Sequence, residues 1–350
     1  MTKYRSHHPK AAIERMTLPR NRGGRGIVGI ANQLKTQIAN LRAYFYQKST
    51  TSELHRAVVE ADIKATPLNL ADRTAESTLI TLEQQMAAWN RKELHGRYPN
   101  VVNSQYVDQQ ASYKWLTTGS LYTETEGFMI AIQDEVIATK NYRKYIIRDS
   151  QLSDDKCRKC KAASETIQHI LGGCGVLTQT DYKARHDTMG KIVHRALALH
   201  HKLVPPPVEP YYRYSPATIL ENENIKLYWD RTIYTDRSVP HNRPDITLWD
   251  KKQRRVYLID FAVVNNNNLQ STYNTKISKY QDIAEEIKAL WQVQSVTIVP
   301  IIISTTGVVP ITLRQDLKTL SLNEGLYAEM QKSVIISSCS TVRRFLNLTM

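Results

Sequence analysis

The stretches Arg243-Pro244-Asp245-Ile246-Thr247-Leu248-Trp249 and Val256-Tyr257-Leu258-Ile259-Asp260 decide the fold. Each contains a short apolar run of strand-forming residues, and a polar segment separates the two runs. This order predicts a hairpin of two antiparallel strands over about 244–264. In such a hairpin Asp245 and Asp260 meet at one edge of a sheet, where two carboxylates can share a divalent cation.

Two lysines follow the hairpin on a helix predicted over about 273–292. Lys276 and Lys279 are three residues apart and therefore lie on one face of that helix. In phosphodiester cleavage, carboxylates hold Mg²⁺, the metal polarises phosphate and water, and a lysine stabilises the developing charge. The two acids and the lysines together favour this chemistry.

Three of the four cysteines lie close together in the pattern Cys157-x2-Cys160-x8-His169-x4-Cys174. Zinc prefers tetrahedral thiolate and imidazole ligands, and a Cys-x2-Cys turn supplies two thiolates from one tight turn. Two glycines just before the last cysteine leave the backbone free to fold back. The spacing predicts a closed, structural zinc site, with buried free cysteines beside an unrelated histidine as the alternative.

Length and composition limit the class of protein. The 350 residues are enough for two or three domains, and 41% hydrophobic with 23% charged residues is ordinary for a soluble globular protein. No apolar run approaches the ~18–20 residues of a membrane span, and the first eight residues lack the apolar segment of a secretory signal. We therefore expect an intracellular, nuclear protein with no membrane partner, whose cysteines are metal ligands or free thiols.

The charge favours a nucleic-acid partner. Lys and Arg number 47 against 33 Asp and Glu, a net charge of +14, which suits a polyanion. Residues 1–60 hold eleven basic and three acidic residues, whereas residues 221–290 hold eleven and ten. A basic arm beside a nearly neutral catalytic region suits a protein that grips a nucleic-acid backbone with one part and does chemistry with another. A solvated basic face without a ligand is the alternative.

Apolar spacing predicts the remaining elements. A buried strand is expected over 296–304, and helices over 31–48, 52–65, 76–92, 124–139, 181–200, 219–229 and 311–348. Prolines in the segment Val204–Pro210 indicate a linker. The predicted domains are a basic region (1–60), a helical region (61–150), a zinc knuckle with its helix (151–203), the linker (204–214) and an α/β domain (215–350).

In this order the parts resemble the C-terminal part of non-LTR retrotransposon reverse transcriptase/endonuclease polyproteins, whose nuclease is restriction-enzyme-like. The resemblance covers about 150–350 and includes Arg185-His186-Asp187 and Lys279-Tyr280-Gln281-Asp282. It extends back to Leu18-Pro19-Arg20 and the glycines after it, which are similar to the stretch just beyond the polymerase thumb. No Tyr/Phe-x-Asp-Asp motif is present, so no polymerase is expected in this chain.

The resemblance implies an α/β fold with a mostly helical N-terminal half and a CCHC zinc knuckle. A PD-(D/E)XK restriction-endonuclease-like domain follows, with a central mixed sheet flanked by helices. Asp245 and Asp260 are then the magnesium ligands. Ala262 stands where classical restriction enzymes have the catalytic lysine, and the following helix supplies it instead, with Lys276 as first choice and Lys279 as second.

Two further positions follow from the same resemblance. An acid on an upstream helix assists catalysis in such enzymes, and Glu221 or Glu223 on the helix predicted over 219–229 would fill that role. Asn265 and the asparagine run after it depart from the proline expected after the second strand. This departure affects the loop that enters the lysine helix and leaves the carboxylates in place.

The expected function is therefore Mg²⁺-dependent nicking of DNA by an endonuclease derived from a non-LTR retrotransposon. Zn²⁺ is the structural cofactor and Mg²⁺ the catalytic one. DNA is the expected partner, with element RNA and a separate reverse transcriptase as further partners. Two alternatives are open: a non-catalytic nucleic-acid-binding remnant that uses the basic arm and the knuckle, and a decayed element without a role.

Overall fold

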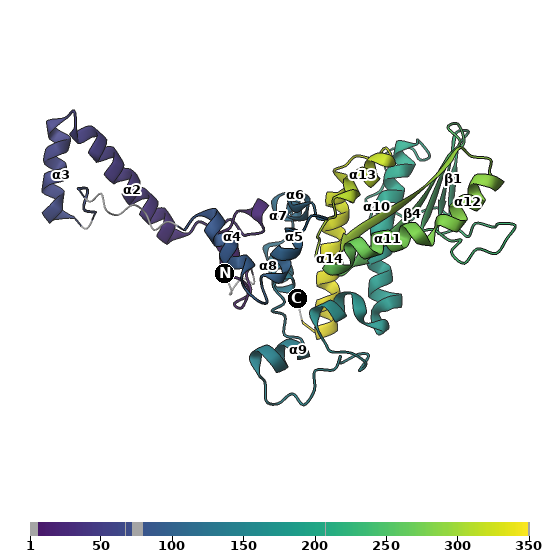
Figure 1. Cartoon of the computed structure of the whole chain (residues 1–350), viewed down its shortest axis with the longest axis horizontal. Helices are drawn as coiled ribbons and strands as arrows, with labels where there is room; N and C mark the ends of the chain where they lie inside the picture. Colours follow the sequence, from purple (N-terminus) through teal and green to yellow (C-terminus); the bar gives the residue numbers. More distant parts are fainter. Residues whose placement is uncertain (1–5, 67, 72–79, 207, 349–350) are drawn as a thin grey trace. The chain divides into compact units, whose positions relative to one another are not determined.

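The computed structural model describes residues 6–66, 68–71, 80–206 and 208–348. The chain divides into two compact units, one formed by Ala12–Lys92 and the other by Glu93–Met350 with the first eleven residues. Figure 1 traces the elements of both units in chain order. The larger unit contains both clusters of candidate functional residues.

The smaller unit is helical. The helices predicted over 31–48 and 52–65 are confirmed, and α2 and α3 pack against one another. Ser52 begins α3 by accepting a hydrogen bond from the His55 N–H, as expected of an N-cap serine. The third predicted helix begins at Thr81, which forms a capping box with Gln84; its predicted first residues, 76–79, lie outside the described residues. The helices are α1 (Glu14–Thr17), α2 (Ile30–Ser49), α3 (Glu53–Ala65) and α4 (Leu82–Asn90), with a 3₁₀ turn at Arg20–Arg22.

The first part of the larger unit consists of short helices. The helix predicted over 124–139 is shorter than expected and ends at Gln133, because Glu135 adopts a left-handed φ of 59° that a helix cannot continue through. The helices here are α5 (Arg97–Val102), α6 (Gln109–Ser112), α7 (Lys114–Thr118), α8 (Thr123–Gln133), α9 (Lys140–Tyr142) and α10 (Lys183–His200). Short turns of helix lie at Arg143–Ile147, His169–Gly173, Gly175–Leu177 and Thr178–Tyr182.

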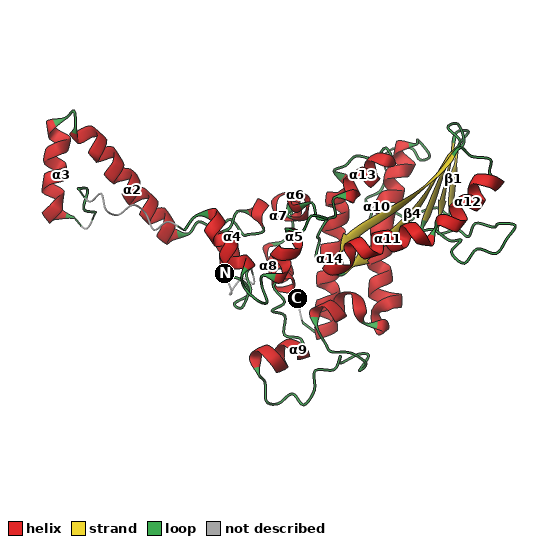
Figure 2. Cartoon of the chain, viewed as in Figure 1, coloured by secondary structure: helices red, strands yellow, loops and turns green. Residues whose placement is uncertain are grey.

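A five-stranded mixed sheet follows, in the order β1-β2-β3-β4-β5 (Figure 2). The first four strands are antiparallel neighbours, and β5 runs parallel to β4. The hairpin predicted over 244–264 is confirmed as β3 and β4, and the strand predicted over 296–304 is β5. The strands are β1 (Ile219–Glu221), β2 (Ile225–Trp229), β3 (Ile246–Asp250), β4 (Arg255–Val264) and β5 (Ser295–Ser304).

The prediction of a helix over 219–229 is wrong, because this segment forms the hairpin of β1 and β2. Ile225 and Leu227 are buried at alternate positions, the period of a strand. Asn222 turns the chain between the two strands: its side-chain oxygen accepts hydrogen bonds from the N–H groups of Asn224 and Ile225. Such local bonding by asparagine favours a turn over a helix.

The single long helix predicted over 273–292 is divided in two. Here α11 (Leu269–Lys279) and α12 (Gln281–Leu290) are separated by Tyr280, whose φ of −106° departs from helical geometry. The Tyr280 side chain is fully buried, and its hydroxyl donates to Asp260. The break therefore directs a tyrosine into the sheet beside a candidate metal ligand.

Helices cover both faces of the sheet. One core cluster joins apolar residues of β2 to β5 with residues of α10, α13 (Thr312–Thr319) and α14 (Leu326–Leu346), including Met189, Leu313 and Val334. A smaller cluster on the opposite face joins Val256 and Leu258 of β4 to residues of α12. A short 3₁₀ turn (Asn266–Asn268) connects β4 to α11.

A buried acid on α13 makes the folding free energy depend on pH. Asp316 is 8% exposed, and the hydroxyl of Tyr273 on α11 donates to its Oδ1 at 3.2 Å. Its Oδ2 has no hydrogen-bond partner among the described residues. Burial raises the pKa of Asp316 to about 7 from an ordinary value of 3.8.

The folded state therefore holds an extra proton between pH 3.8 and about 7, and the free energy of unfolding falls as the pH rises through this window. Above it the loss levels off at on the order of 4 kcal/mol. We expect Asp316→Asn to remove most of this pH dependence and to be more stable than the parent at pH 8. Urea unfolding at pH 5, 6, 7 and 8 measures the effect, with the exposed Asp282→Asn as control. An unchanged pH slope in Asp316→Asn would contradict the assignment.

Candidate functional site

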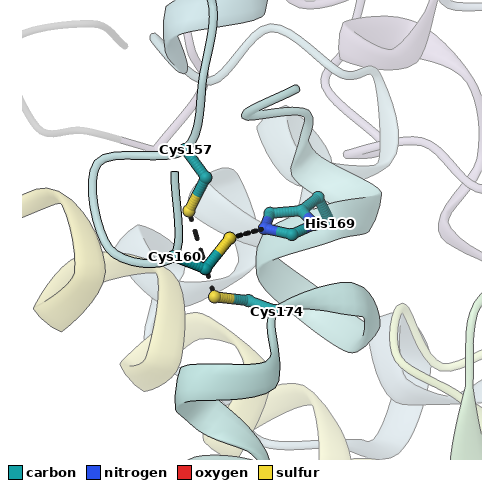
Figure 3. A group of neighbouring side chains, drawn as sticks. All are labelled: Cys157, Cys160, His169 and Cys174. Carbon is teal, nitrogen blue, oxygen red and sulfur yellow. Dashed lines mark hydrogen bonds between the residues drawn. The ribbon is translucent and has the colours of Figure 1, made fainter. Parts of the chain in front are cut away.

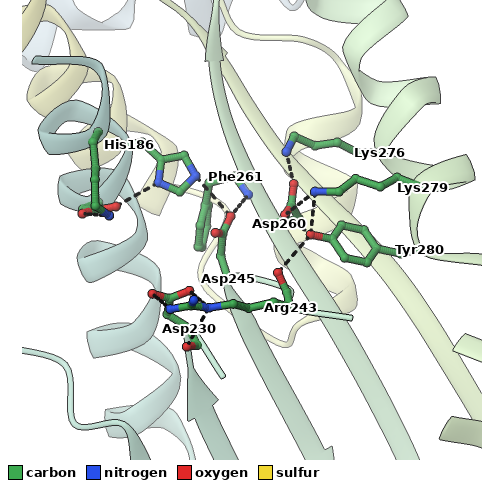
Figure 4. Close-up of polar contacts among 11 residues, drawn as sticks. His186, Asp230, Arg243, Asp245, Asp260, Phe261, Lys276, Lys279 and Tyr280 are labelled. Carbon is green, nitrogen blue, oxygen red and sulfur yellow. Dashed lines mark hydrogen bonds and ion pairs between the residues drawn. The ribbon is translucent and has the colours of Figure 1, made fainter. Parts of the chain in front are cut away.

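The hairpin sets the two predicted carboxylates opposite each other (Figure 4). Ile246 pairs with Ile259 in the antiparallel register, so the next pair outward is Asp245 and Asp260. Opposed residues of an antiparallel pair place their Cβ atoms about 4.5–5.5 Å apart. The structure thus brings together the two acids predicted as metal ligands, although their metal-binding role stays a prediction.

Asp260 is buried, with 3% of its surface exposed, and it is surrounded by groups from the turn between α11 and α12. Lys276 forms an ion pair with Oδ2, and the Tyr280 hydroxyl donates to Oδ1 at 2.5 Å. Lys279 lies farther away, with Nζ 3.8 Å from Oδ1. Lys276 is therefore closer to the carboxylate than Lys279, although the catalytic role of either lysine stays a prediction.

Burial and the neighbouring charge of Lys279 lower the pKa of Lys276 to about 8, although the charge of Asp245 opposes the shift. An amine with this pKa exists in both protonation states near neutral pH. Such a group can hold a proton or release it during a reaction.

Asp245 meets a histidine that sequence reasoning did not assign to the site. His186 of α10 places Nε2 3.1 Å from Asp245 Oδ2 and Nδ1 3.1 Å from an oxygen of Asp187. The Phe261 N–H also donates to Asp245 Oδ2, at 2.7 Å. The Arg185-His186-Asp187 triplet was part of the family resemblance, but nothing in its spacing relates it to a strand sixty residues away. Only the packing of α10 against β4 reveals the contact.

The histidine and the acid shift each other's pKa. Burial by itself lowers the pKa of His186, but the hydrogen bonds to Asp187 and Asp245 outweigh it and raise the pKa to about 9. Burial alone would raise the pKa of Asp245, but the hydrogen bond and charge of His186 lower it overall, assisted by Phe261. Asp245 is therefore ionised at neutral pH, as a metal-binding carboxylate must be.

The segment before Asp245 is held by a second ion pair. Arg243 binds the carboxylate of Asp230 through two nitrogens, at 2.8 and 2.7 Å. The Asp230 N–H donates to the Asp245 carbonyl at 2.8 Å, and the Tyr280 hydroxyl also contacts the Arg243 carbonyl. These contacts fix the backbone at the point where β3 begins.

A cavity of about 460 Å³ opens beside Asp245. Its lining comes from the helical turn Thr178–Tyr182, from α10 and from the strand ends, and its charged or titratable groups include Lys183, His186, Asp187, Asp230 and Asp245. A cavity of this size falls within the range of roughly 300–1,000 Å³ found for ligand sites. The cavity leaves Asp245 accessible to a ligand.

Glu221 and Glu223 do not reach this site. Glu221 is the last residue of β1 and pairs with Lys226 and Lys251, at the end of the sheet opposite Asp245. Glu223 lies in the turn between β1 and β2. Their proposed role depended on a helix over 219–229, and the strands found there direct both acids away from the carboxylate pair. The helix beside Asp245 is α10, and it contributes His186 and Asp187.

The four predicted zinc ligands converge in a second cluster (Figure 3). Their ligand atoms all lie within 4.8 Å of one another. The Sγ atoms of Cys157 and Cys174 are 3.9 Å apart, and Cys160 Sγ lies 3.3 Å from His169 Nε2. Zinc–sulfur bonds of about 2.3 Å in a tetrahedron separate two sulfurs by about 3.8 Å. The donor set and its spacing therefore fit Zn²⁺, and the cluster could bind it.

Within the cluster, the backbone favours the thiolate of Cys160. Hydrogen bonds from the Ala162 and Ala163 N–H groups lower the pKa of Cys160 to about 6 although burial opposes the shift, whereas burial raises the pKa of Cys174 to about 11. Cys157 and Cys174 are fully buried, and the Tyr182 hydroxyl accepts from the Cys174 N–H at 3.1 Å. The fourth cysteine, Cys339, is buried in α14 outside this cluster.

Comparison with known proteins agrees with the sequence resemblance at a coarse level. Over 124 residues the chain is 30% identical to the retrovirus-related Pol polyprotein from type-1 retrotransposable element R2 of Bradysia coprophila. This match covers 33% of the chain but 14% of that relative, so the chain corresponds to a small part of its length. The similarity supports a retrotransposon origin.

No helix among the described residues is both long and apolar enough to cross a membrane.

The profile of one protein family, described as "L protein N-terminus", matches residues 135–329. The matched segment contains both the cysteine cluster and the carboxylate pair, and it makes up more than half of the chain. The chain therefore belongs to the L protein N-terminus family.

Proposed function

We propose that this chain is a metal-dependent endonuclease that nicks DNA, derived from a non-LTR retrotransposon. The observation that carries the proposal is the meeting of Asp245, Asp260 and Lys276 at the mouth of a hairpin, from two strands and a helix. Two carboxylates with a lysine of lowered pKa suit hydrolysis of a phosphodiester. We assign residues 215–350 to a PD-(D/E)XK-like domain on this basis.

The carboxylate oxygens fit Mg²⁺, which prefers hard oxygen ligands and is often held by one or two carboxylates. Asp245 and Asp260 would hold it, and it would polarise the phosphate and lower the pKa of a bound water. In the structure Lys276 neutralises Asp260 Oδ2. A metal held at Asp260 would compete with Lys276 for this carboxylate, and a displaced Lys276 amine would be free to orient the attacking water and to stabilise developing charge.

The remaining parts of the chain would bind the substrate. The basic residues of 1–60 suit contact with phosphates, and the cysteine cluster would be a zinc knuckle. We propose DNA as the substrate, element RNA and a separate reverse transcriptase as further partners, and the nucleus as the place of action.

Plasmid nicking tests the proposal. We expect the parent protein to convert supercoiled plasmid to open circles when Mg²⁺ is added and not when it is omitted. Lys276→Ala should lower the rate about 10²–10³-fold, because a donor aimed at transition-state charge is lost. Lys279→Ala should lower it less, since its Nζ is farther from Asp260.

Lys288→Ala is the matched control, because this lysine is exposed on α12. If the parent binds plasmid but does not nick it with Mg²⁺, the endonuclease is excluded. That outcome would favour the non-catalytic nucleic-acid binder.

A further inference from the structure

A second polar cavity lies in the larger unit, at the far end of the strand that carries Asp260. Its volume is about 540 Å³, and its walls come from α5, from α8 and the residues after it, from the zinc-knuckle segment, and from the loops that follow β4 and β5. Side-chain amides and two threonines make up most of its polar lining, including Gln133, Gln168, Asn265, Asn266, Asn267 and Thr306. The asparagine run, which departs from the family pattern, is therefore part of this cavity.

Hydrogen bonds hold the amides in place. Asn265 Nδ2 donates to the Gln168 carbonyl at 3.2 Å, and a Cβ on Gly172 would lie 3.2 Å from the Asn265 side chain. Gly172 and Gln168 belong to the segment that contains His169, so the zinc-knuckle segment forms one wall. The loop after β4 is thus fixed directly to the knuckle.

The opposite wall is fixed in the same way. The buried Gln133 donates to the Thr306 carbonyl at 3.0 Å, and the Thr306 hydroxyl donates to Asn266 Oδ1 at 2.7 Å. The amide nitrogen of Asn266 is not used in that bond. Asn267 is exposed. The cavity therefore presents amide groups whose positions are set by neighbouring backbone.

The charge of the cavity argues against a phosphate as its ligand. Arg97 is the cation among the described lining residues, and it is paired with Glu135 at 2.9 Å. Gln168 Nε2 also donates to Glu135, at 2.6 Å. A carboxylate at this position disfavours an anion. Neutral amides offer both donors and acceptors, which match the edges of nucleobases.

The position of the cavity matches a strand of nucleic acid that runs from the carboxylate pair. Asn265 follows Asp260 by five residues along β4, a separation of about 17 Å at ~3.3 Å per residue. Stacked nucleotides rise about 3.4 Å each, so this span corresponds to roughly five nucleotides. A base enters a cavity lined by side chains only when it is unstacked from its neighbours.

We propose that this cavity binds an unpaired nucleobase of the nucleic-acid strand held at the Asp245–Asp260 site, and that the asparagine run after β4 reads its edge. The proposal rests on the proposed nuclease function, which it deepens by naming a base-reading site. Apolar side chains of Ile132, Ile167 and Leu171 also line the cavity and suit the faces of a base.

Binding of single-stranded 20-mers to the full chain, without added Mg²⁺, tests the inference. The probes are fluorescein-labelled dA, dT and dC 20-mers and an abasic 20-mer of the same length and charge. We expect the parent to bind its best base-containing probe about tenfold more tightly than the abasic one, the effect of one good base contact. Asn266→Ala/Asn267→Ala should lose most of this ratio while its affinity for the abasic probe stays within about twofold.

Asn267→Ala alone is the second variant, because its side chain is exposed and its removal need not disturb the loop. Gln253→Ala is the matched control, an exposed amide in the β3–β4 turn, and should keep the parent ratio. An unchanged ratio in both asparagine variants would overturn the proposal, as would a parent that binds all probes equally or binds none. A parent protein that does not nick plasmid but still prefers the base-containing probe over the abasic one would exclude the nuclease. The base-binding site would remain supported if the asparagine variants lose this preference.

Discussion

Asp260→Asn is expected to lower plasmid nicking about 10³-fold, because a metal-holding carboxylate contributes several kcal/mol to the stabilisation of transition-state charge. The substitution keeps the size of the side chain and removes the charge that pairs with Lys276. The Tyr280 hydroxyl can still donate to the amide oxygen. The measurement is the initial rate of open-circle formation at saturating Mg²⁺, with plasmid affinity determined in parallel.

Two controls make this result specific to the metal site. Asp282→Asn removes an exposed carboxylate from α12 and should nick like the parent. Thermal unfolding of Asp260→Asn shows whether the loss of rate follows from loss of fold, because the partly buried Lys276 is left without its charged partner. A folded Asp260→Asn protein that nicks at the parent rate would remove Asp260 from the catalytic site.

Cys157→Ser is expected to eliminate bound zinc and to destabilise the segment around the cluster. Structural zinc sites bind with apparent free energies of roughly 10–16 kcal/mol, and the loss of one thiolate from a closed four-ligand site removes most of this energy. Cys157 is fully buried, so a serine there cannot restore the interaction through solvent. Metal analysis of the purified chain should give about one zinc for the parent and none for the variant.

Limited proteolysis provides the structural readout for the same variant. We expect new cleavage within 151–182, because the two halves of the cluster are no longer held together. Cys339→Ser is the matched control, since its thiol is buried elsewhere in α14 and the variant should retain its zinc. A parent chain that contains no zinc would contradict the assignment.

Local patterns in the sequence were sufficient for much of this architecture. The β3–β4 hairpin, strand β5 and the clustering of Cys157, Cys160, His169 and Cys174 all follow from short-range spacing, and the structure confirms them. The prediction of a helix over 219–229 was wrong because its apolar residues fit either period. The turn at Asn222 and the pairing of β2 with β3 select the strands. Glu221 was misplaced for the same reason.

Tertiary contacts account for what the sequence could not predict. His186 approaches Asp245 through helix packing, over a separation of fifty-nine residues. The division between α11 and α12 follows from Tyr280, whose burial and bond to Asp260 outweigh a continuous helical pattern. The asparagine run has no periodic pattern, and its place in a cavity depends on contacts with the knuckle segment.

Strand β4 connects the carboxylate pair to the asparagine run without interruption, and from Asp260 to Val264 it is paired with β5. A strand alternates its faces, so inserting one residue between Asp260 and Asn265 would turn the later side chains to the wrong side. An insertion of two residues keeps the later side chains on their original face of the sheet, and it lengthens the strand by about 6.6 Å. The offset between a cut and a recognised base would then change in steps of roughly two nucleotides during evolution. The length of the strand would therefore set the distance between the cut and the recognised base.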